Sequence, residues 1–114
     1  MSIYSVVMDT LKPLNIPTFP ITKKGDHETY ITFFQYDEAV ALAADDEEKQ
    51  TGYFIQVDFW TKDALKYTDL SEKVKNTLTA AGFSKKGAAD LYEQDTQIYH
   101  KGLRFYYVLK TKNS

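Results

Sequence analysis

The sequence lacks cysteine, and it contains only three prolines and five glycines in 114 residues. Without cysteine there are no disulfide bonds and no thiolate metal ligands, which is typical of proteins from reducing compartments. No apolar run approaches the ~20 residues that span a bilayer. The N-terminus has no basic segment followed by an apolar stretch. We therefore expect neither a membrane span nor a secretory signal.

Basic residues are not in excess either, because 14 Lys and Arg stand against 16 Asp and Glu, for a net charge of −2. A protein that binds duplex nucleic acid needs clustered basic residues to displace the counterions of the phosphate backbone, so sequence-specific binding is disfavoured. The glycine-rich patterns G-x-G-x-x-G and G-x-x-x-x-G-K-[ST] do not occur. We expect no cofactor.

Aromatic residues, in contrast, are abundant: nine Tyr, seven Phe and one Trp. The chain is 43% hydrophobic and 26% charged, a balance typical of a globular protein. Its length fits one domain, over residues 1–114, with a single core. Aromatic side chains bury large areas in cores and are enriched at interfaces. This chain has more of them than one small core needs.

Two helices are predicted. Residues 2–12 have the apolar spacing of one helical face, with Ser2 as the N-cap and Pro13 as the end. Residues 69–81 form the second helix, because Asp69 and the Glu three residues later make a capping-box-like start. Gly82 stands where a left-handed C-cap is needed.

The strands are predicted from β-branched and aromatic runs with alternating polarity. Residues 29–36 form one strand, and residues 38–44 pair with residues 53–60 in a hairpin. The turn of this hairpin is residues 45–50, and Gly52 eases the start of the return strand. In residues 53–60 one face holds Tyr53, Ile55, Val57 and Phe59, and the other holds Phe54, Gln56, Asp58 and Trp60.

The C-terminal segment is predicted to be a second hairpin. Its last strand alternates, with Leu103, Phe105, Tyr107 and Leu109 pointing inward and Arg104, Tyr106 and Lys110 pointing outward.

The resulting order, α-β-β-β-α-β-β, predicts an α+β fold. It has a single, mostly antiparallel sheet of four to five strands, with two helices packed on one face. The other face still carries Phe54, Trp60 and Tyr106. That face must be covered by loops or by another chain, and we predict that these three residues lie in an interface between subunits.

Four consecutive acids, Asp45, Asp46, Glu47 and Glu48, are the most conspicuous charge feature. Carboxylates bind hard cations, but a calcium loop spaces its ligands at alternate positions and this run does not. We interpret it as a solvated turn whose like charges keep it extended and blunt a strand edge, and we expect no metal site. No nucleophile accompanies His27 or His100, so we assign no catalytic residue and expect no enzyme.

Three segments, taken in order, resemble one protein family. They are "YITFFQYDEAVALAADDEEKQTGYFIQVDFWTK" at residues 30–62, "AAGF" at 80–83 and "AADLYEQDTQIYHKGLRFYY" at 88–107. This series is similar to the tail-terminator, or tail-completion, proteins of long-tailed bacteriophages and Gram-positive prophages. The similarity runs from about Tyr30 to Tyr107.

The resemblance implies a structural virion protein without a cofactor. Such a subunit forms a ring, typically a hexamer, on the head-proximal end of the tail tube. It joins the tube while the virion is being assembled in the host bacterial cytoplasm. There it stops tube growth and joins the tail-tube protein to the head connector. Asp45, Asp46, Glu47 and Glu48 would then tip an arm that faces the lumen or docks a neighbour, since carboxylates repel the phosphates of passing DNA.

Two alternatives remain at this level. A small cytosolic monomer of the inhibitor or immunity type is also acidic, compact and free of cysteine, and its acidic loop would face a basic partner. A small α+β enzyme would require a pocket with convergent polar groups, which the sequence does not indicate.

Overall fold

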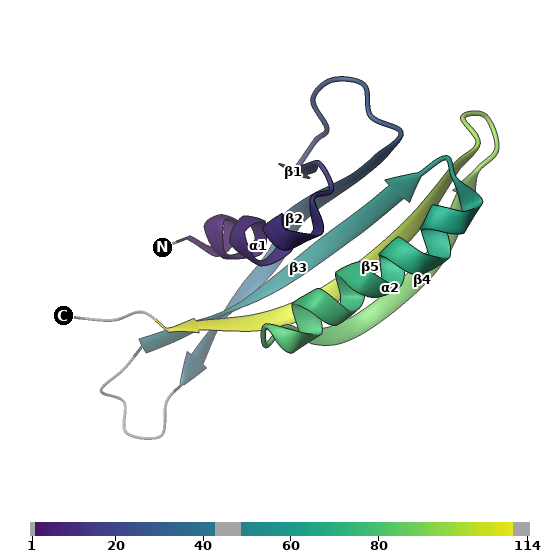
Figure 1. Ribbon diagram of the computed structural model, residues 1–114. Coiled ribbons are helices and arrows are strands. Elements are labelled where there is room, and N and C mark those ends of the chain that lie inside the picture. The colour runs from purple at the N-terminus through teal and green to yellow at the C-terminus, as the bar shows by residue number, and fades with distance from the viewer. Residues whose placement is uncertain (1, 43–48, 111–114) are drawn as a thin grey trace.

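The computed structural model of the chain describes residues 2–42 and 49–110. The chain forms two α-helices and one sheet, and Figure 1 shows the helices lying over the twisted sheet. The elements are α1 (Ile3–Leu11), the 3-10 helix η1 (Lys12–Leu14), β1 (Thr18–Pro20), β2 (Thr29–Leu42), β3 (Lys49–Thr61), α2 (Ala64–Ala80), β4 (Ser84–Glu93) and β5 (Ile98–Lys110). The predicted α+β class and the order α-β-β-β-α-β-β are confirmed.

The sheet has five strands in the order β1-β2-β3-β5-β4. All neighbouring pairs are antiparallel except β1 and β2, where Thr18 lies opposite Ile31 in a parallel pair. β2 runs through both segments that were expected as separate strands, residues 29–36 and 38–44, as far as Leu42. A register shift between Gln35 and Asp37 marks a bulge where the two segments join.

Helix α1 forms as predicted. The Oγ of Ser2 accepts a hydrogen bond from the backbone N–H of Ser5 at 3.1 Å, which satisfies one of the free donors of the first turn. The chain then tightens into η1, which contains Pro13 near its start. Proline is tolerated there because its missing N–H would have had no partner in that turn.

Helix α2 begins five residues earlier than predicted, so its expected start at residue 69 is wrong. Asp63 is the N-cap, and its Oδ1 accepts from the N–H of Leu65 at 2.9 Å. Asp69 lies inside the helix and forms an exposed ion pair with Lys73 at 3.5 Å. The extra turn is stabilised by Tyr67, which packs against the core. Gly82 follows the helix with φ +101°, as predicted.

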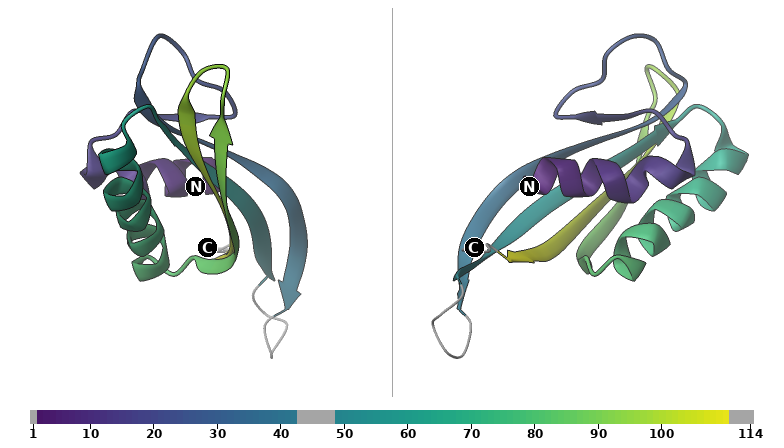
Figure 2. Two further views of the ribbon diagram at one scale, coloured as in Figure 1. Left: turned by 90° about the vertical axis from the view of Figure 1, so that its right-hand side faces the viewer. Right: turned by 60° about the vertical axis from the view of Figure 1, so that its left-hand side comes forward.

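The core lies between the sheet and the two helices, which cover the same face (Figure 2). Full burial of one large apolar side chain in this core contributes about 1.5–3 kcal/mol to the free energy of unfolding. The inward faces predicted for residues 53–60 and for the last strand are confirmed at five positions. The buried apolar residues are Ile3, Val7, Leu11, Ile31, Phe33, Ile55, Val57, Phe59, Val74, Leu78, Phe83, Leu103 and Phe105.

The β2–β3 hairpin extends past both helices (Figure 1). We call its extension, residues 37–42 and 49–53, the arm. Lys49 pairs with Leu42 and Gln50 with Ala41, so both belong to β3, and their expected place in the turn is wrong. The antiparallel pairing of β2 with β3 continues into residues 49 and 50, which were expected to belong to the turn. In the described part of the chain, no helix is long and apolar enough to cross a membrane.

Candidate functional site

The face of the sheet that points away from the helices, which we call the outer face, carries the three predicted interface residues, Phe54, Trp60 and Tyr106. Successive side chains of a strand point to opposite faces. With Ile55 and Val57 in the core, Gln56 and Asp58 therefore lie on the outer face. Two aromatic clusters stand at its two ends, and a chain of polar side chains runs between them.

Near the arm, the rings of Tyr36, Phe54 and Tyr106 form the arm-side cluster. The ring centroids of Phe54 and Tyr106 are 4.9 Å apart, and those of Tyr36 and Phe54 are 5.9 Å apart. The guanidinium of Arg104 lies 4.8 Å from the centroid of the Tyr36 ring, a cation–π contact. Tyr36 is 39% exposed, whereas Phe54 and Tyr106 are half-buried.

Gly52 allows this packing. A Cβ atom at position 52 would collide with the ring of Tyr106 from the neighbouring strand. The absence of a side chain at Gly52 thus leaves room for the Tyr106 ring to lie over β3. The sequence suggested only that Gly52 eases the start of the strand.

At the other end, Trp60 is stacked between two rings of its own chain. The centroid of His100 lies 3.7 Å from that of Trp60, and the centroid of Tyr30 lies 5.8 Å away. The Trp60 Nε1 donates a hydrogen bond to Thr32 Oγ1 at 3.0 Å. Burial raises the pKa of Tyr30, and the nearby negative charge of Glu93 adds to this.

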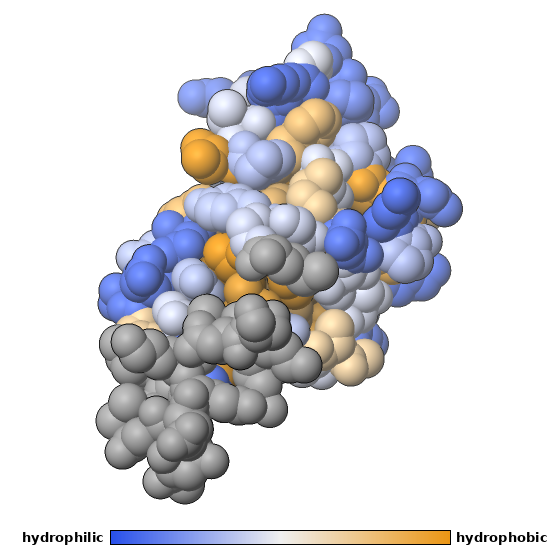
Figure 3. Space-filling model, turned by 90° about the vertical axis from the view of Figure 1, so that its left-hand side faces the viewer, coloured by the Kyte–Doolittle hydropathy of each residue, from blue (hydrophilic) through white to orange (hydrophobic). Residues whose placement is uncertain are grey.

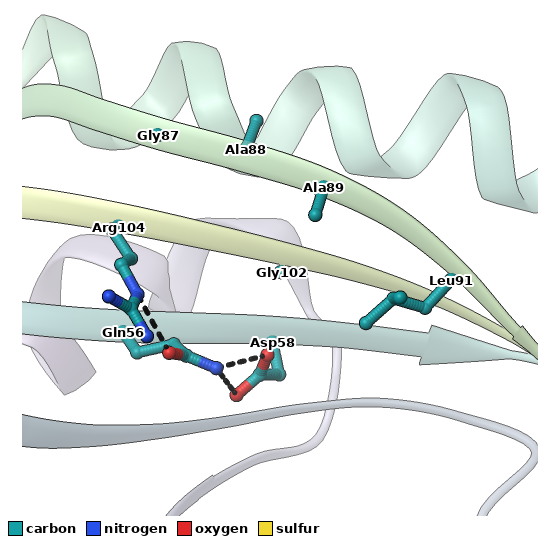
Figure 4. A pocket seen from close by; sticks show the side chains of 8 residues that line it. All are labelled: Gln56, Asp58, Gly87, Ala88, Ala89, Leu91, Gly102 and Arg104. Atoms are coloured by element: carbon teal, nitrogen blue, oxygen red, sulfur yellow. Dashed lines mark hydrogen bonds between the residues drawn. The ribbon is translucent and has the colours of Figure 1, made fainter.

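A chain of hydrogen bonds runs between the clusters, and Figure 4 shows its links from Arg104 through Gln56 to Asp58. Arg104 Nε donates to Gln56 Oε1 at 3.1 Å, and Gln56 Nε2 donates to Asp58 Oδ1 at 3.0 Å. Asp58 Oδ1 is also 2.7 Å from His100 Nε2. Only 4% of Asp58 is exposed. A buried carboxylate needs such partners, because leaving it unpaired would be strongly unfavourable.

An open groove of about 360 Å³ runs over this polar chain, beside the small residues Gly87, Ala89 and Gly102 (Figure 4). Its polar side chains already bond to one another, and it contains no nucleophile next to a general base.

Seen from the left-hand side of Figure 1, the surface outside the grey atoms shows apolar residues among polar ones (Figure 3). Large continuous apolar patches mark obligate interfaces, and scattered ones do not require explanation.

The structure brings two of the three predicted interface residues together. Phe54 contacts Tyr106, whereas Trp60 lies six residues further along β3, about 20 Å away at ~3.3 Å per residue. Sequence reasoning missed Tyr30 and Tyr36, because only the pairing register shows which rings on neighbouring strands meet. Whether any of these residues lies in an interface remains a prediction.

Asp45, Asp46, Glu47 and Glu48 lie outside the described residues, so the interpretations of the acidic run also remain predictions. Within residues 2–42 and 49–110, no group of three or more His, Asp or Glu side chains is placed to hold a metal ion.

A separate cluster fastens β4 to helix α2. The Tyr67 hydroxyl donates a short hydrogen bond to Asp90, and Lys101 Nζ lies 2.9 Å from the same carboxylate. The hydrogen bond from Tyr67, followed by that from Lys101, lowers the pKa of Asp90. Burial, followed by the contact with Asp90, raises the pKa of Tyr67.

Comparison with known proteins finds a likeness in fold among solved structures. No protein-family model and no curated protein sequence matches the chain. Among solved structures, the fold is similar to that of a chain in a structure described as "Virion of native gene transfer agent (GTA) particle", with a TM-score of 0.63 and 14% identity. The match covers 94% of this chain and 86% of that chain. At this identity the likeness shows a common fold over nearly the full length of both chains.

Proposed function

We propose that this chain is a structural protein of a phage-like virion, located at the junction of tail and head. It forms a ring on the head-proximal end of the tail tube, stops tube growth and offers a surface to the head connector. The observation that carries the proposal is the fold likeness to a chain of a gene transfer agent virion, over 94% of this chain. The resemblance of residues 30–107 to tail-terminator proteins narrows the proposal to the end of the tail.

The chemistry of the outer face supports a role in assembly. Aromatic residues and arginine are enriched in interface centres, and the arm-side cluster combines three aromatic rings with Arg104. A standard interface covers roughly 800 Å² per partner, an area that one sheet face provides. In this proposal Phe54 and Tyr106 contact another copy or the adjoining tail protein. Trp60 borders the same surface.

The acidic run fits the same role as a non-adhesive element. In a ring through which DNA passes, the carboxylates of Asp45, Asp46, Glu47 and Glu48 repel the phosphate backbone. Basic side chains in the same place would retain DNA through counterion release.

The abundance of the chain in purified particles tests the proposal. Quantitative mass spectrometry should detect it at the copy number of a single ring, far below that of the tail-tube protein. A small cytosolic inhibitor, the alternative reading of the sequence, would be absent from washed particles and would sediment as a monomer or with a non-viral partner. Absence from particles that have intact tails would contradict the proposal.

A further inference from the structure

The described sheet ends on two strand edges that have no strand partner. β4 lies at one side and pairs only with β5. At the other side, β1 covers β2 only at residues 31–33, so the outer edge of β2 is free of strand pairing from Tyr36 onward. An open edge presents unpaired N–H and C=O groups and is a template for pairing with another chain.

The β4 edge begins with two basic residues on opposite faces. Lys85 lies opposite Phe105, a core residue, and is therefore on the helix side of the sheet. Lys86 occupies a bulge, and its Nζ lies 5.9 Å from the centroid of the Tyr106 ring on the outer face. Both are exposed, and neither forms an ion pair with another described side chain.

The free part of the β2 edge carries two acids, again on opposite faces. Asp37 lies opposite Phe54 and is on the outer face, whereas Glu38 lies opposite Tyr53 and is on the helix side. Both are exposed. In the two stretches compared, residues 85–86 and 37–38, each edge therefore has one charge on each face, and the charges of the two stretches are of opposite sign.

We propose that β4 of one copy pairs antiparallel with the free edge of β2 in a second copy, with Lys85 opposite Glu38 and Lys86 opposite Asp37. This register places each ion pair on a single face of the combined sheet. The inference rests on the self-association in the proposed function, but it does not depend on the virion role.

The strand directions agree with a ring. Three successive antiparallel pairings separate β2 from β4, so β4 runs opposite to β2 within one copy. If a neighbouring copy is related by rotation about an axis parallel to the strands, its strands keep the same directions. The β2 strand of that neighbour is then antiparallel to the β4 strand of the first copy. Such a head-to-tail contact closes into a ring when the rotation per copy divides a full turn.

The bulges match in the same register. β2 is irregular between Gln35 and Asp37, and β4 is irregular between Lys85 and Gly87. Each bulge shifts the alternation of side chains by one residue. Because Gly87 would lie opposite the bulged Tyr36, both strands shift at the same point and their faces agree on either side of it. Backbone hydrogen bonds supply the affinity in this mode, and the charges select the register.

Pairing of like edges is less favourable. Two β2 edges would bring acids together. Two β4 edges could place Lys85 near Asp90 of the other copy, but Asp90 already has two partners, Tyr67 and Lys101, whereas the carboxylates of Asp37 and Glu38 each accept one hydrogen bond from a neighbouring residue. The charges therefore favour the unlike pair and disfavour the symmetric dimers.

Engineered cysteines test the register directly, because the chain has no cysteine of its own. The variants Glu38→Cys and Lys85→Cys are mixed under mild oxidation. Directly opposite residues have Cβ atoms about 4.5–5.5 Å apart, close to the reach of a disulfide. We expect the heterodimer to exceed both homodimers. The matched control pairs Glu38→Cys with Lys86→Cys, whose side chain lies on the other face, and should cross-link less. A Lys85→Cys homodimer in excess, or no preference at all, would overturn the proposal.

A second pair measures the part played by charge. Ala39→Cys and Ser84→Cys lie opposite each other in the same register and leave all four charges in place. Reversing Lys85 and Lys86 to Glu in the Ser84→Cys chain should slow disulfide formation about tenfold, the order expected for two exposed ion pairs. Changing Asp37 and Glu38 to Lys in the Ala39→Cys chain should restore it. An unchanged rate after reversal would contradict the assignment.

These outcomes separate the inference from the proposed function. If the cross-links fail while tails still require the chain, the edge pairing is wrong and the role in the virion stands. If the cross-links form while particles lack the chain, the pairing stands and the virion role is wrong.

Discussion

The imidazole of His100 stacks on the indole of Trp60, with ring centroids 3.7 Å apart and planes inclined by 12°. The same imidazole is 2.7 Å from the nearly buried carboxylate of Asp58. The only tryptophan of the chain is thus held in place by the chain itself. Trp60 therefore contributes to the stability of the single subunit as well as to the surface proposed for assembly.

Substitutions on the outer face should separate these two contributions. Trp60→Ala removes two stacking contacts and a hydrogen bond, so we expect it to lower the free energy of unfolding by about 2 kcal/mol. Tyr36→Ala removes a ring that is 39% exposed, and we expect a loss below ~1 kcal/mol together with a clear defect in assembly. Denaturant unfolding and particle yield measure the two effects.

Leu65→Ala is the matched control for Tyr36→Ala. Leu65 is an apolar residue that is 86% exposed on α2, away from the outer face, and its removal should change neither quantity. Normal particle yield with Tyr36→Ala would remove the arm-side cluster from the proposed interface.

Gly52 and Gly87 offer a paired test of the arm-side packing. A Cβ at position 52 would collide with the Tyr106 ring, whereas a Cβ at position 87 meets no atom within 4 Å. We expect Gly52→Ala to lower the free energy of unfolding by about 1–3 kcal/mol, as overpacking does, and Gly87→Ala to change it little. Urea unfolding of both variants provides the measurement. If both variants changed the free energy of unfolding equally, the Tyr106 ring would be able to move away from position 52 without loss of stability.

The sequence predicted which side chains of β3 face the core, because alternation of side chains along a strand depends only on their order in the chain. It predicted that Ile55 and Val57 face the core while Phe54 and Trp60 face outward, since strand geometry leaves no other choice. It did not predict the contact between Phe54 and Tyr106. That contact depends on the register of β3 against β5, in which Phe54 lies opposite Tyr106, and local pattern does not encode register.

The start of α2 shows a different limit. Asp63 and Asp69 are both followed by helix-forming residues, and Asp69 had the better capping pattern because of Glu72. The packing of Tyr67 against the core decides between them, because tertiary contacts override local preference. The sequence of residues 64–68 by itself does not indicate that Tyr67 packs against the core.

The cluster of Tyr67 and Asp90 predicts a dependence of stability on pH at both extremes. The pKa of Asp90 is lowered in the folded state, so its contribution is present above its unfolded pKa and is lost as the pH falls through the folded one. The pKa of Tyr67 is raised above its usual value of 10.0. Its contribution is therefore complete below pH 10.0 and is lost as the pH rises beyond that value.

Tyr67→Phe isolates this effect. Compared with the native chain, the variant should lose less stability between neutral pH and strongly alkaline pH, and also less on acidification. Thermal unfolding midpoints of both proteins across the pH range provide the comparison. Parallel curves would show that the hydroxyl of Tyr67 does not couple to folding.

Divalent metals should not affect the chain. A ligand that binds only the native state raises stability by linkage, and we interpret Asp45, Asp46, Glu47 and Glu48 as a solvated turn without a bound cation. Thermal unfolding curves recorded with calcium, with magnesium and with a chelator should superimpose. A rise of several degrees in calcium would replace this interpretation with a metal site.

The most direct test of the central claim is the length of tails made without the chain. The gene is deleted from the genome that encodes it, and the phage-like particles that this strain makes are measured by electron microscopy. If the chain forms the ring that ends the tube and joins it to the head, tails should grow beyond their normal length and remain without heads, and expression of the chain in trans should restore both features. Tails of normal length joined to filled heads in the deletion strain would contradict the account.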